Sequence, residues 1–242
     1  MESTGPPKHI GIVACTAEGA SLCYRTICAE GPGLLGQHEH PEVSLHNLSL
    51  ARYVEYLDRD EVEAVGDLML DSAEKLARAG AEFLICPDNT IHVAFDYLEP
   101  RSPLPWLHIA EVVAEEAKRA GYSRLGLTGT HWLVNSEVYP QRVSRQGLEL
   151  VRPEPQEREE MGRIIMSELV YGQFKPESVE YFRSVIGDLR ERGCDAVILG
   201  CTEIPLVVDD ANSPLPTLDS TRLLARAALR RAVSCSKRTQ RK

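Results

Sequence analysis

Short apolar runs alternate with longer segments of helical periodicity along this chain. Residues 61–79 carry apolar side chains three and four positions apart, which predicts an amphipathic helix that ends at Gly80. The same spacing predicts further helices over 109–120, 178–192 and 221–233. Short apolar runs predict strands over 10–14, 83–86, 125–127 and 196–199. This alternation is typical of an α/β protein with mostly parallel strands.

Two distant stretches of the chain read as copies of one motif. The sequence L-A-R-A-G-A-E-F-L-I-C-P-D-N-T-I occupies 76–91, and L-R-E-R-G-C-D-A-V-I-L-G-C-T-E-I occupies 189–204. Their alignment places Asp88 opposite Cys201, each just after an apolar run that reads as a strand. A proton-transferring group at equivalent points of two repeats suggests chemistry on two faces of one substrate.

Two further matches follow in the same order and support an internal duplication. I-G-I at Ile10 matches L-G-L at Leu125, and S-P-L-P occurs at both 102–105 and 213–216. The offsets of the three matches lie between 111 and 115 residues, which fits a duplicated unit with minor insertions.

The two S-P-L-P segments are the expected crossing points between the halves, because proline there ends regular structure. We therefore predict two pseudo-symmetric α/β lobes, residues 1–100 with 217–242 and residues 104–212. Each lobe is expected to hold a short, mostly parallel sheet flanked by helices. Such folds hold ligands at the carboxyl ends of their strands, so we expect the active site between the lobes.

The composition narrows the class of partner. The net charge of −9 argues against nucleic acid, and no apolar run is long enough to span a membrane. The first seven residues lack a basic segment followed by an apolar one, so we expect no secretory signal. The seven cysteines show no disulfide spacing, and several lie inside apolar runs. We expect a reduced, cytoplasmic protein that acts on a small molecule.

Cys201 is the strongest candidate for chemistry. It follows V-I-L-G and precedes T-E-I-P, which places it at a predicted strand-to-helix turn. Backbone N–H groups and a helix dipole there would favour a thiolate, which is a credible base for a carbon acid. The alternative is a buried cysteine that fills space behind a glycine. The duplication and the neighbouring Thr202 and Glu203 favour the catalytic interpretation.

Asp88 admits two roles that do not exclude each other. It follows Pro87 and precedes N-T-I-H, so it could cap the next helix as well as take part in catalysis. His92 lies one helical turn further on and could hydrogen-bond the carboxylate, or it could be a satisfied buried histidine. The sequence leaves both alternatives open.

G-C-T-E-I at 200–204 and D-N-T-I-H at 88–92 resemble the two signature segments of the aspartate/glutamate racemase superfamily. The opening I-G-I-V-A-C-T-A-E-G-A-S-L-C-Y-R resembles that family's glycine-rich start, and the similarity runs over nearly the whole chain. The resemblance implies a two-lobed α/β fold, a homodimer, and cofactor-independent chemistry at an α-carbon. In the family, one of two facing cysteines removes the α-proton and the other returns a proton to the opposite face.

The resemblance also assigns roles to individual residues. It places Cys201 and Asp88 at the two catalytic positions. We also expect Glu203, which lies beside Cys201 in the sequence, to bind substrate. The substrate's α-carboxylate or amine would be held by Asn89, Thr90, Thr130 and Thr202, and its side-chain carboxylate by Lys175. We expect no metal, since H-x-H at 38–40 with His46 is too weak a pattern for one.

The chain departs from the family pattern at three places. Asp88 replaces the first cysteine, Ala14-Cys15 replaces a Gly-Gly pair, and Leu133 replaces a common threonine. Aspartate and cysteine differ by about 4.6 units in reference pKa, or about 6 kcal/mol of proton affinity. Asp88 is therefore a poor base and a scarce proton donor at neutral pH, unless burial raises its pKa.

We predict from these residues a cofactor-independent racemase or epimerase of a small, acidic amino acid, with Cys201 and Asp88 on opposite faces of the substrate. Two alternatives stay open. One is a single-cysteine decarboxylase or isomerase of a small dicarboxylate. The other is a ligand-binding protein that has lost catalysis.

Overall fold

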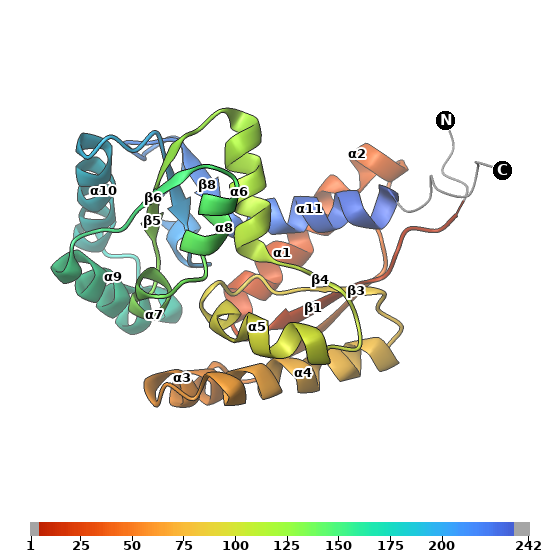
Figure 1. Ribbon diagram of the computed structural model, residues 1–242. Helices are drawn as coiled ribbons and strands as arrows, with labels where there is room; N and C mark the ends of the chain where they lie inside the picture. The colour runs from red at the N-terminus through yellow and green to blue at the C-terminus, as the bar shows by residue number, and fades with distance from the viewer. Residues whose placement is uncertain (1–4, 235–242) are drawn as a thin grey trace. The chain divides into compact units, whose positions relative to one another are not determined.

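The computed structural model describes residues 5–234, so 1–4 and 235–242 of the predicted first lobe lie outside the described residues. The chain forms two compact units, one with the residues up to Ile109 and from Thr221, the other with Ala110–Ser220. Each unit holds one four-stranded parallel sheet with helices on it (Figure 1). The predicted α/β fold with two parallel sheets is thus confirmed. Within residues 5–234 no helix is long and apolar enough to cross a membrane.

The first unit has the strand order β2-β1-β3-β4. Its strands are β1 (Ile10–Ala14), β2 (Val43–Asn47), β3 (Phe83–Ile85) and β4 (Trp106–Leu107). Its helices are α1 (Ala17–Glu30), α2 (Pro32–Leu35), α3 (Leu50–Asp58), α4 (Val62–Arg78), η1 (Thr90–Ala94), α5 (Phe95–Leu98), η2 (Glu99–Arg101) and α11 (Ser220–Ser234). The predicted apolar stripe of α4 is buried on one face of the sheet, and α1 and α11 cover the other (Figure 1).

The second unit has the strand order β6-β5-β7-β8. Its strands are β5 (Arg124–Thr128), β6 (Glu149–Val151), β7 (Ala196–Leu199) and β8 (Thr217–Asp219). Its helices are α6 (Ile109–Ala120), α7 (His131–Asn135), α8 (Pro140–Arg145), α9 (Pro155–Ser167), η3 (Leu169–Tyr171), α10 (Pro176–Glu191) and η4 (Ile204–Leu206). The core of this unit lies under α9 and α10, around β7.

Strand order and register repeat between the two sheets. Ile10 of β1 pairs with Phe83 of β3. The sequence alignment matches these two residues with Leu125 of β5 and Ala196 of β7, which also pair with each other. The pairs between the third and fourth strands of each sheet repeat in the same way. The two predicted catalytic residues therefore follow equivalent strands at the same position, as an internal duplication requires.

The lobe boundaries predicted from the prolines each fall one strand too early. Trp106–Leu107 pairs with β3 and completes the first sheet, whereas Thr217–Asp219 pairs with β7 and completes the second. The units divide just after these strands, at 109–110 and 220–221. Each S-P-L-P segment ends the loop before one of these strands, and the residues after it are extended. They can therefore pair with the sheet of their own unit.

Candidate active site

Cys201 lies at the carboxyl end of β7, beside the end of β5. The Gly200 N–H donates a hydrogen bond to the carbonyl oxygen of Thr128 at 2.9 Å. A Cβ atom on Gly200 would lie only 2.6 Å from that oxygen, so the close approach requires glycine. The G-C pair thus carries Cys201 to the end of a central strand, where its side chain is buried.

The Cys201 thiol donates a hydrogen bond to the Glu203 carboxylate. The Sγ–Oε2 distance is 2.9 Å, and the Thr202 hydroxyl donates to the same oxygen at 2.7 Å. All three side chains are buried. A carboxylate that accepts this bond stabilises the neutral thiol, and its charge opposes a thiolate. It is also placed to take the thiol proton, so the turn holds a donor and its acceptor in direct contact.

The helix expected after Cys201 is absent, which corrects the predicted source of thiolate stabilisation. The chain forms only the three-residue 3₁₀ helix η4, whose dipole is small. The Asn212 side chain explains why no longer helix follows. Its Oδ1 accepts from the Asp209 N–H and its Nδ2 donates to the Val207 carbonyl, both at 3.0 Å. These bonds satisfy in a turn the backbone groups that a helix would use.

We expect Glu203→Gln to make the Cys201 thiol react faster with iodoacetamide at neutral pH. The substitution removes both the anionic acceptor that stabilises the thiol and the charge that opposes the thiolate. Mass spectrometry of the peptide that contains Cys201 separates its alkylation from that of the other six cysteines. Glu177→Gln, at an exposed position of α10, is the control and should leave the rate unchanged. A slower reaction in Glu203→Gln would contradict the assigned role.

In the first unit, both carboxylate oxygens of Asp88 accept hydrogen bonds from the turn after β1. The Cys15 N–H donates to Oδ2 at 3.0 Å, and the Thr16 hydroxyl donates to Oδ1 at 2.7 Å. Thr16 is also the N-cap of the 14-residue helix α1, where its hydroxyl accepts from the Gly19 N–H. The two donors and the positive end of α1 together stabilise the ionised carboxylate.

The surroundings of Asp88 show whether it caps the helix that follows and which of its atoms His92 contacts. Asn89 occupies the N-cap position of η1, so Asp88 does not cap the helix that follows it. His92 meets Asp88 at its backbone carbonyl, which lies 3.0 Å from Nδ1. Both Asn89 and His92 are buried, whereas Thr90 is half-buried.

A buried tyrosine belongs to the surroundings of Asp88, although no sequence motif marks it. Tyr53 of α3 is fully buried. Burial raises the pKa of Tyr53 far above its usual value, and charge at Cys15, Cys86 and Asp88 raises it further. Among the described residues its hydroxyl has no hydrogen-bond partner of proper geometry. The neighbouring Ser72 hydroxyl donates instead to a backbone carbonyl of α4. Tyr53 therefore brings a neutral hydroxyl, next to Ser72, to this part of the first unit.

Thr130 lies at the end of β5, the strand next to Cys201. It is the N-cap of α7, where its hydroxyl accepts from the Leu133 N–H at 3.3 Å. The Leu133 side chain is fully buried, and a Cβ atom on either Gly129 or Gly200 would lie within 3 Å of its Cδ2. Leu133 thus packs over the glycines that end the two central strands. The structure brings Thr130, Thr202 and Glu203 to the same edge of the sheet as Cys201.

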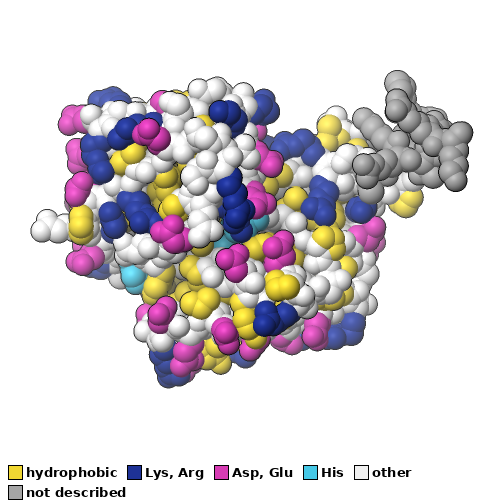
Figure 2. Space-filling model, viewed as in Figure 1, with side chains coloured by type: hydrophobic (Ala, Val, Ile, Leu, Met, Phe, Trp, Pro, Cys, Tyr) yellow, Lys and Arg dark blue, Asp and Glu magenta, His cyan; other side chains and the backbone are white. Residues whose placement is uncertain are grey.

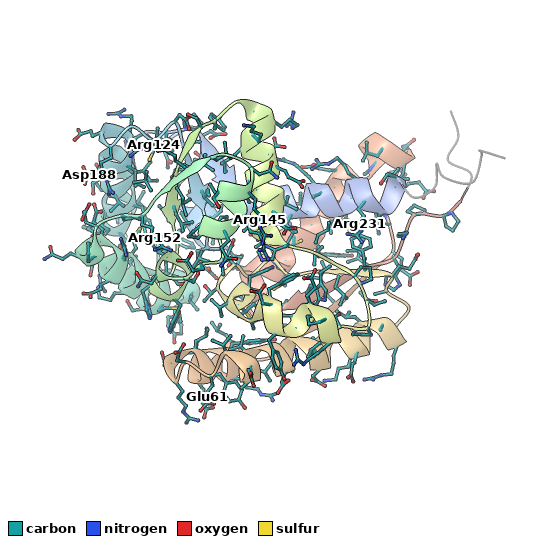
Figure 3. All side chains as sticks on the ribbon, in the orientation of Figure 1. Glu61, Arg124, Arg145, Arg152, Asp188 and Arg231 are labelled. Carbon is teal, nitrogen blue, oxygen red and sulfur yellow. The ribbon has the colours of Figure 1, made fainter. Side chains whose placement is uncertain are left out.

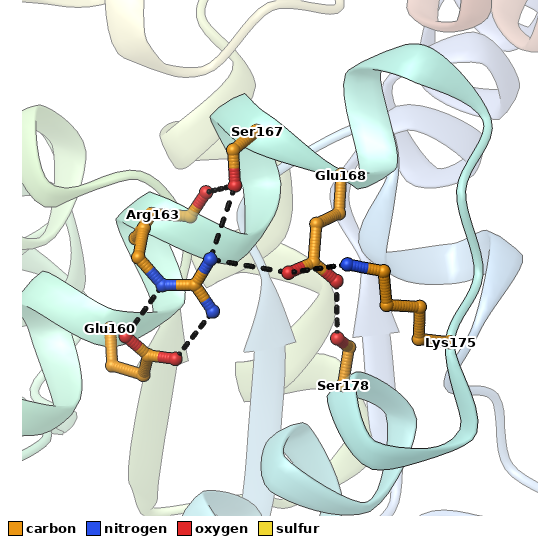
Figure 4. A network of polar contacts seen from close by, with 6 residues as sticks. All are labelled: Glu160, Arg163, Ser167, Glu168, Lys175 and Ser178. Atoms are coloured by element: carbon orange, nitrogen blue, oxygen red, sulfur yellow. Dashed lines mark hydrogen bonds and ion pairs between the residues drawn. The ribbon is translucent and has the colours of Figure 1, made fainter.

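Lys175 lies in a separate polar network of the second unit (Figure 4). Its Nζ is 3.4 Å from Glu168 Oε1, and Arg163 contacts the same oxygen at 3.2 Å. The Ser178 hydroxyl donates to the other oxygen at 2.5 Å. The Ser178 hydrogen bond, then Arg163 and Lys175, hold the pKa of Glu168 below its usual value. The ammonium group of Lys175, which we predicted to bind substrate, is therefore paired with the Glu168 carboxylate of the same unit.

Metal ligands do not gather anywhere in residues 5–234. No group of three or more histidine, cysteine, aspartate or glutamate side chains in that range is arranged to hold a metal ion.

Comparison with known proteins gives one consistent result. Residues 12–228 match the sequence profile described as Asp/Glu/Hydantoin racemase. The broad specificity amino-acid racemase RacX of Bacillus subtilis is 23% identical over 206 residues, 84% of this chain and 86% of that protein. The crystal structure of a candidate Asp/Glu racemase from Yersinia pestis is 30% identical with a TM-score of 0.84, over 93% of this chain and 99% of that one. An aspartate racemase homologue from Pyrococcus horikoshii OT3 is 28% identical with a TM-score of 0.78, over the same shares.

Proposed function

Because the chain belongs to the Asp/Glu/Hydantoin racemase family, and is an amino-acid racemase, we propose that it inverts a small acidic amino acid without a cofactor. Cys201 and Asp88 serve opposite faces of the substrate's α-carbon in this proposal. The observation that carries it is the contact of 2.9 Å between the Cys201 thiol and Glu203 at the end of a central strand. It supplies a potential carbon base together with an acceptor for its proton.

The proposed reaction proceeds through the minor form in which Glu203 has taken the thiol proton and is neutral, because the Glu203 carboxylate opposes the thiolate. The Cys201 thiolate then removes the α-proton, so an S–H bond forms as the C–H bond breaks. The electron pair moves into the substrate carboxylate, whose added negative charge needs hydrogen-bond donors. Asn89, Thr90, Thr130 and Thr202 are the proposed donors. The protonated form of Asp88 then gives its proton to the opposite face and becomes the carboxylate. Loss of the Glu203 proton to water and uptake of a proton by Asp88 restore the starting state.

In this proposal, Asp88 transfers protons at its face of the substrate less readily than Cys201 does at the opposite face. Its hydrogen bonds with Cys15 and Thr16 stabilise the carboxylate and so oppose the protonation that donation to the substrate requires. A carboxylate is also a far weaker base than a thiolate. Exchange at the Cys201 face should therefore be faster than inversion.

Proton NMR in heavy water tests the proposed function directly. The protein is incubated with each enantiomer of aspartate and of glutamate, and the loss of the α-proton signal is followed together with chiral analysis of the product. We expect exchange of at least one enantiomer, with inversion at a lower rate. Absence of exchange with all of these amino acids would refute the acidic amino-acid substrate.

The same feature of Asp88 favours a second candidate function. A site with one working thiol suits a decarboxylase or isomerase of a small dicarboxylate, which needs a proton on one face only. Release of carbon dioxide from malonate-like acids would identify the decarboxylase. If the chain only binds a ligand, neither exchange nor carbon dioxide release will occur, and Cys201 need not react with an alkylating agent.

We propose that Lys175 binds the side-chain carboxylate of the substrate, in exchange for its contact with Glu168. Lys175→Met should then raise the KM for aspartate and glutamate about tenfold, as expected for loss of a charge-assisted hydrogen bond, and leave the KM for alanine unchanged. Lys118→Met, at an exposed position of α6, is the matched control. An equal effect on alanine would mean that Lys175 serves only the network around Glu168.

A further inference from the structure

An open cavity of about 470 Å³ in the second unit is lined by four arginines. We call it the arginine pocket and define it by Arg124, Arg152, Arg158 and Arg192, which line it together with Glu137. Lys and Arg side chains gather on this flank of the unit (Figure 2). Arg124 and Arg152 lie there, near α9 and α10 (Figure 3). Such a concentration of positive charge contrasts with the net charge of −9 of the chain.

The arginine pocket is separate from the turn that carries Cys201. It lies along β6, the edge strand of the sheet, which contributes Leu150 and Val151 to its lining. β5 lies between β6 and β7, the strand that leads to Cys201. The pocket is therefore distinct from the turn that carries Cys201.

Three of the four guanidinium groups are paired with exposed carboxylates. Arg124 contacts Glu149 at 2.8 Å, and Arg152 contacts Glu137 at 3.0 Å. The third pair, Arg192 with Glu154, measures 3.2 Å. The carboxylate side chains are between 63% and 69% exposed, so these pairs are weak and easily exchanged.

The guanidinium groups also have unused hydrogen-bonding capacity. The buried Nε atoms of Arg124 and Arg152 have no hydrogen-bond partner among the described residues. Arg158 contacts the uncharged Pro153 carbonyl at 2.6 Å and the Asn135 side chain at 3.0 Å. An anion with several oxygens could bind these groups at once, since the planar guanidinium matches carboxylate and phosphate geometry.

We propose that the arginine pocket binds a small polyanion with two or more phosphate or carboxylate groups, and that its occupancy acts on the short helix α7. The volume is in the range of small-molecule sites and exceeds that needed for a single inorganic ion. A ligand with two separated anionic groups would engage arginines near both ends of β6, because Arg124 pairs with its first residue, Glu149, and Arg152 follows its last.

The helix α7 joins the arginine pocket to the candidate active site. At its carboxyl end, Arg152 donates to the Ser136 carbonyl at 2.6 Å and Arg158 donates to the Asn135 side chain at 3.0 Å. At its amino end, Thr130 is the N-cap beside the central strand ends. A polyanion that draws both arginines toward itself removes the contacts at one end of α7. A helix of only five residues contains few hydrogen bonds of its own.

Inorganic pyrophosphate, titrated at constant ionic strength, tests the proposal in the full chain. Calorimetry should show saturable binding to the unmodified protein, and Arg158→Gln should weaken it about tenfold. Arg124→Gln, which leaves α7 untouched, should weaken it similarly. Arg119→Gln, an exposed arginine of α6 outside the pocket, should bind as the unmodified protein does. No saturable binding, or equal binding by all variants, would overturn the site.

Tryptophan fluorescence tests the link to α7 without any measurement of catalysis. Trp132 lies in α7, and the only other tryptophan is Trp106 of β4. Pyrophosphate should change the fluorescence of the unmodified protein, and Trp132→Phe should remove the change while calorimetry still detects binding. Binding without a fluorescence change that depends on Trp132 would overturn the link. Replacing pyrophosphate by citrate shows whether carboxylate groups bind as phosphate groups do.

Discussion

Cys201→Ser is expected to reduce exchange of the α-proton by roughly 10³-fold, within the range for loss of an acid–base group. Serine has nearly the same shape and can keep the hydrogen bond to Glu203, which the Cys201 thiol makes at 2.9 Å. An alkoxide is far less accessible than a thiolate at neutral pH, so the substitution removes the base and little else. Proton NMR in heavy water, with the enantiomer that exchanges fastest, measures the effect.

Cys194→Ser is the matched control for this substitution. Cys194 is buried in the same unit, and burial raises the pKa of its thiol. It lies before β7, at the opposite end of that strand from Cys201. The control should retain exchange at nearly the original rate. Comparable losses in the two variants would show that the unit needs buried thiols for its stability, and would remove Cys201 from the proposed chemistry.

The parts of the fold that the sequence predicts are those specified by local pattern. Apolar runs at Ile10 and at Leu125 mark the first strand of each sheet, and the repeat with its small offset gives the register of the central pairs. The pairing of Cys201 with Glu203 also falls within one short segment, because G-C-T-E brings the thiol and the carboxylate together in a single turn. The sequence places Glu203 near Cys201, but the hydrogen bond between their side chains depends on the turn that stands where a helix was predicted.

The features that the sequence could not predict depend on distant parts of the chain. The donors to Asp88 lie 72 and 73 residues before it, and only the pairing of β1 with β3 brings them close. The missing helix after Cys201 depends on the side chain of Asn212, which a strand-to-helix pattern does not reveal. The arginine pocket collects residues from 124 to 192, in segments without a common motif. The donors to Asp88, the missing helix and the arginine pocket each change the local chemistry and leave the two sheets unchanged.

Asp88→Asn is expected to lower the rate of inversion by roughly 10²-fold, since one acid–base group is lost, while exchange at the Cys201 face changes by only a few-fold. Asparagine keeps the size of the side chain and one acceptor for Cys15 or Thr16, but it neither accepts nor donates a proton in the reaction. Chiral chromatography measures inversion, and NMR in the same sample measures exchange. Asp58→Asn, at the exposed end of α3, is the control and should leave both rates unchanged.

Asp88→Cys separates a working acid–base group from a merely structural carboxylate. A thiol has a reference pKa of about 8.5, so both its forms are populated near neutral pH and it can donate as well as accept a proton. If proton return at this face limits inversion, Asp88→Cys should bring the rate of inversion up to the rate of exchange. Equal loss of exchange and inversion in both Asp88 variants would contradict a one-sided site. Asp88 would then act by holding the turn after β1, through Cys15 and Thr16, and the second proton would have to come from another group.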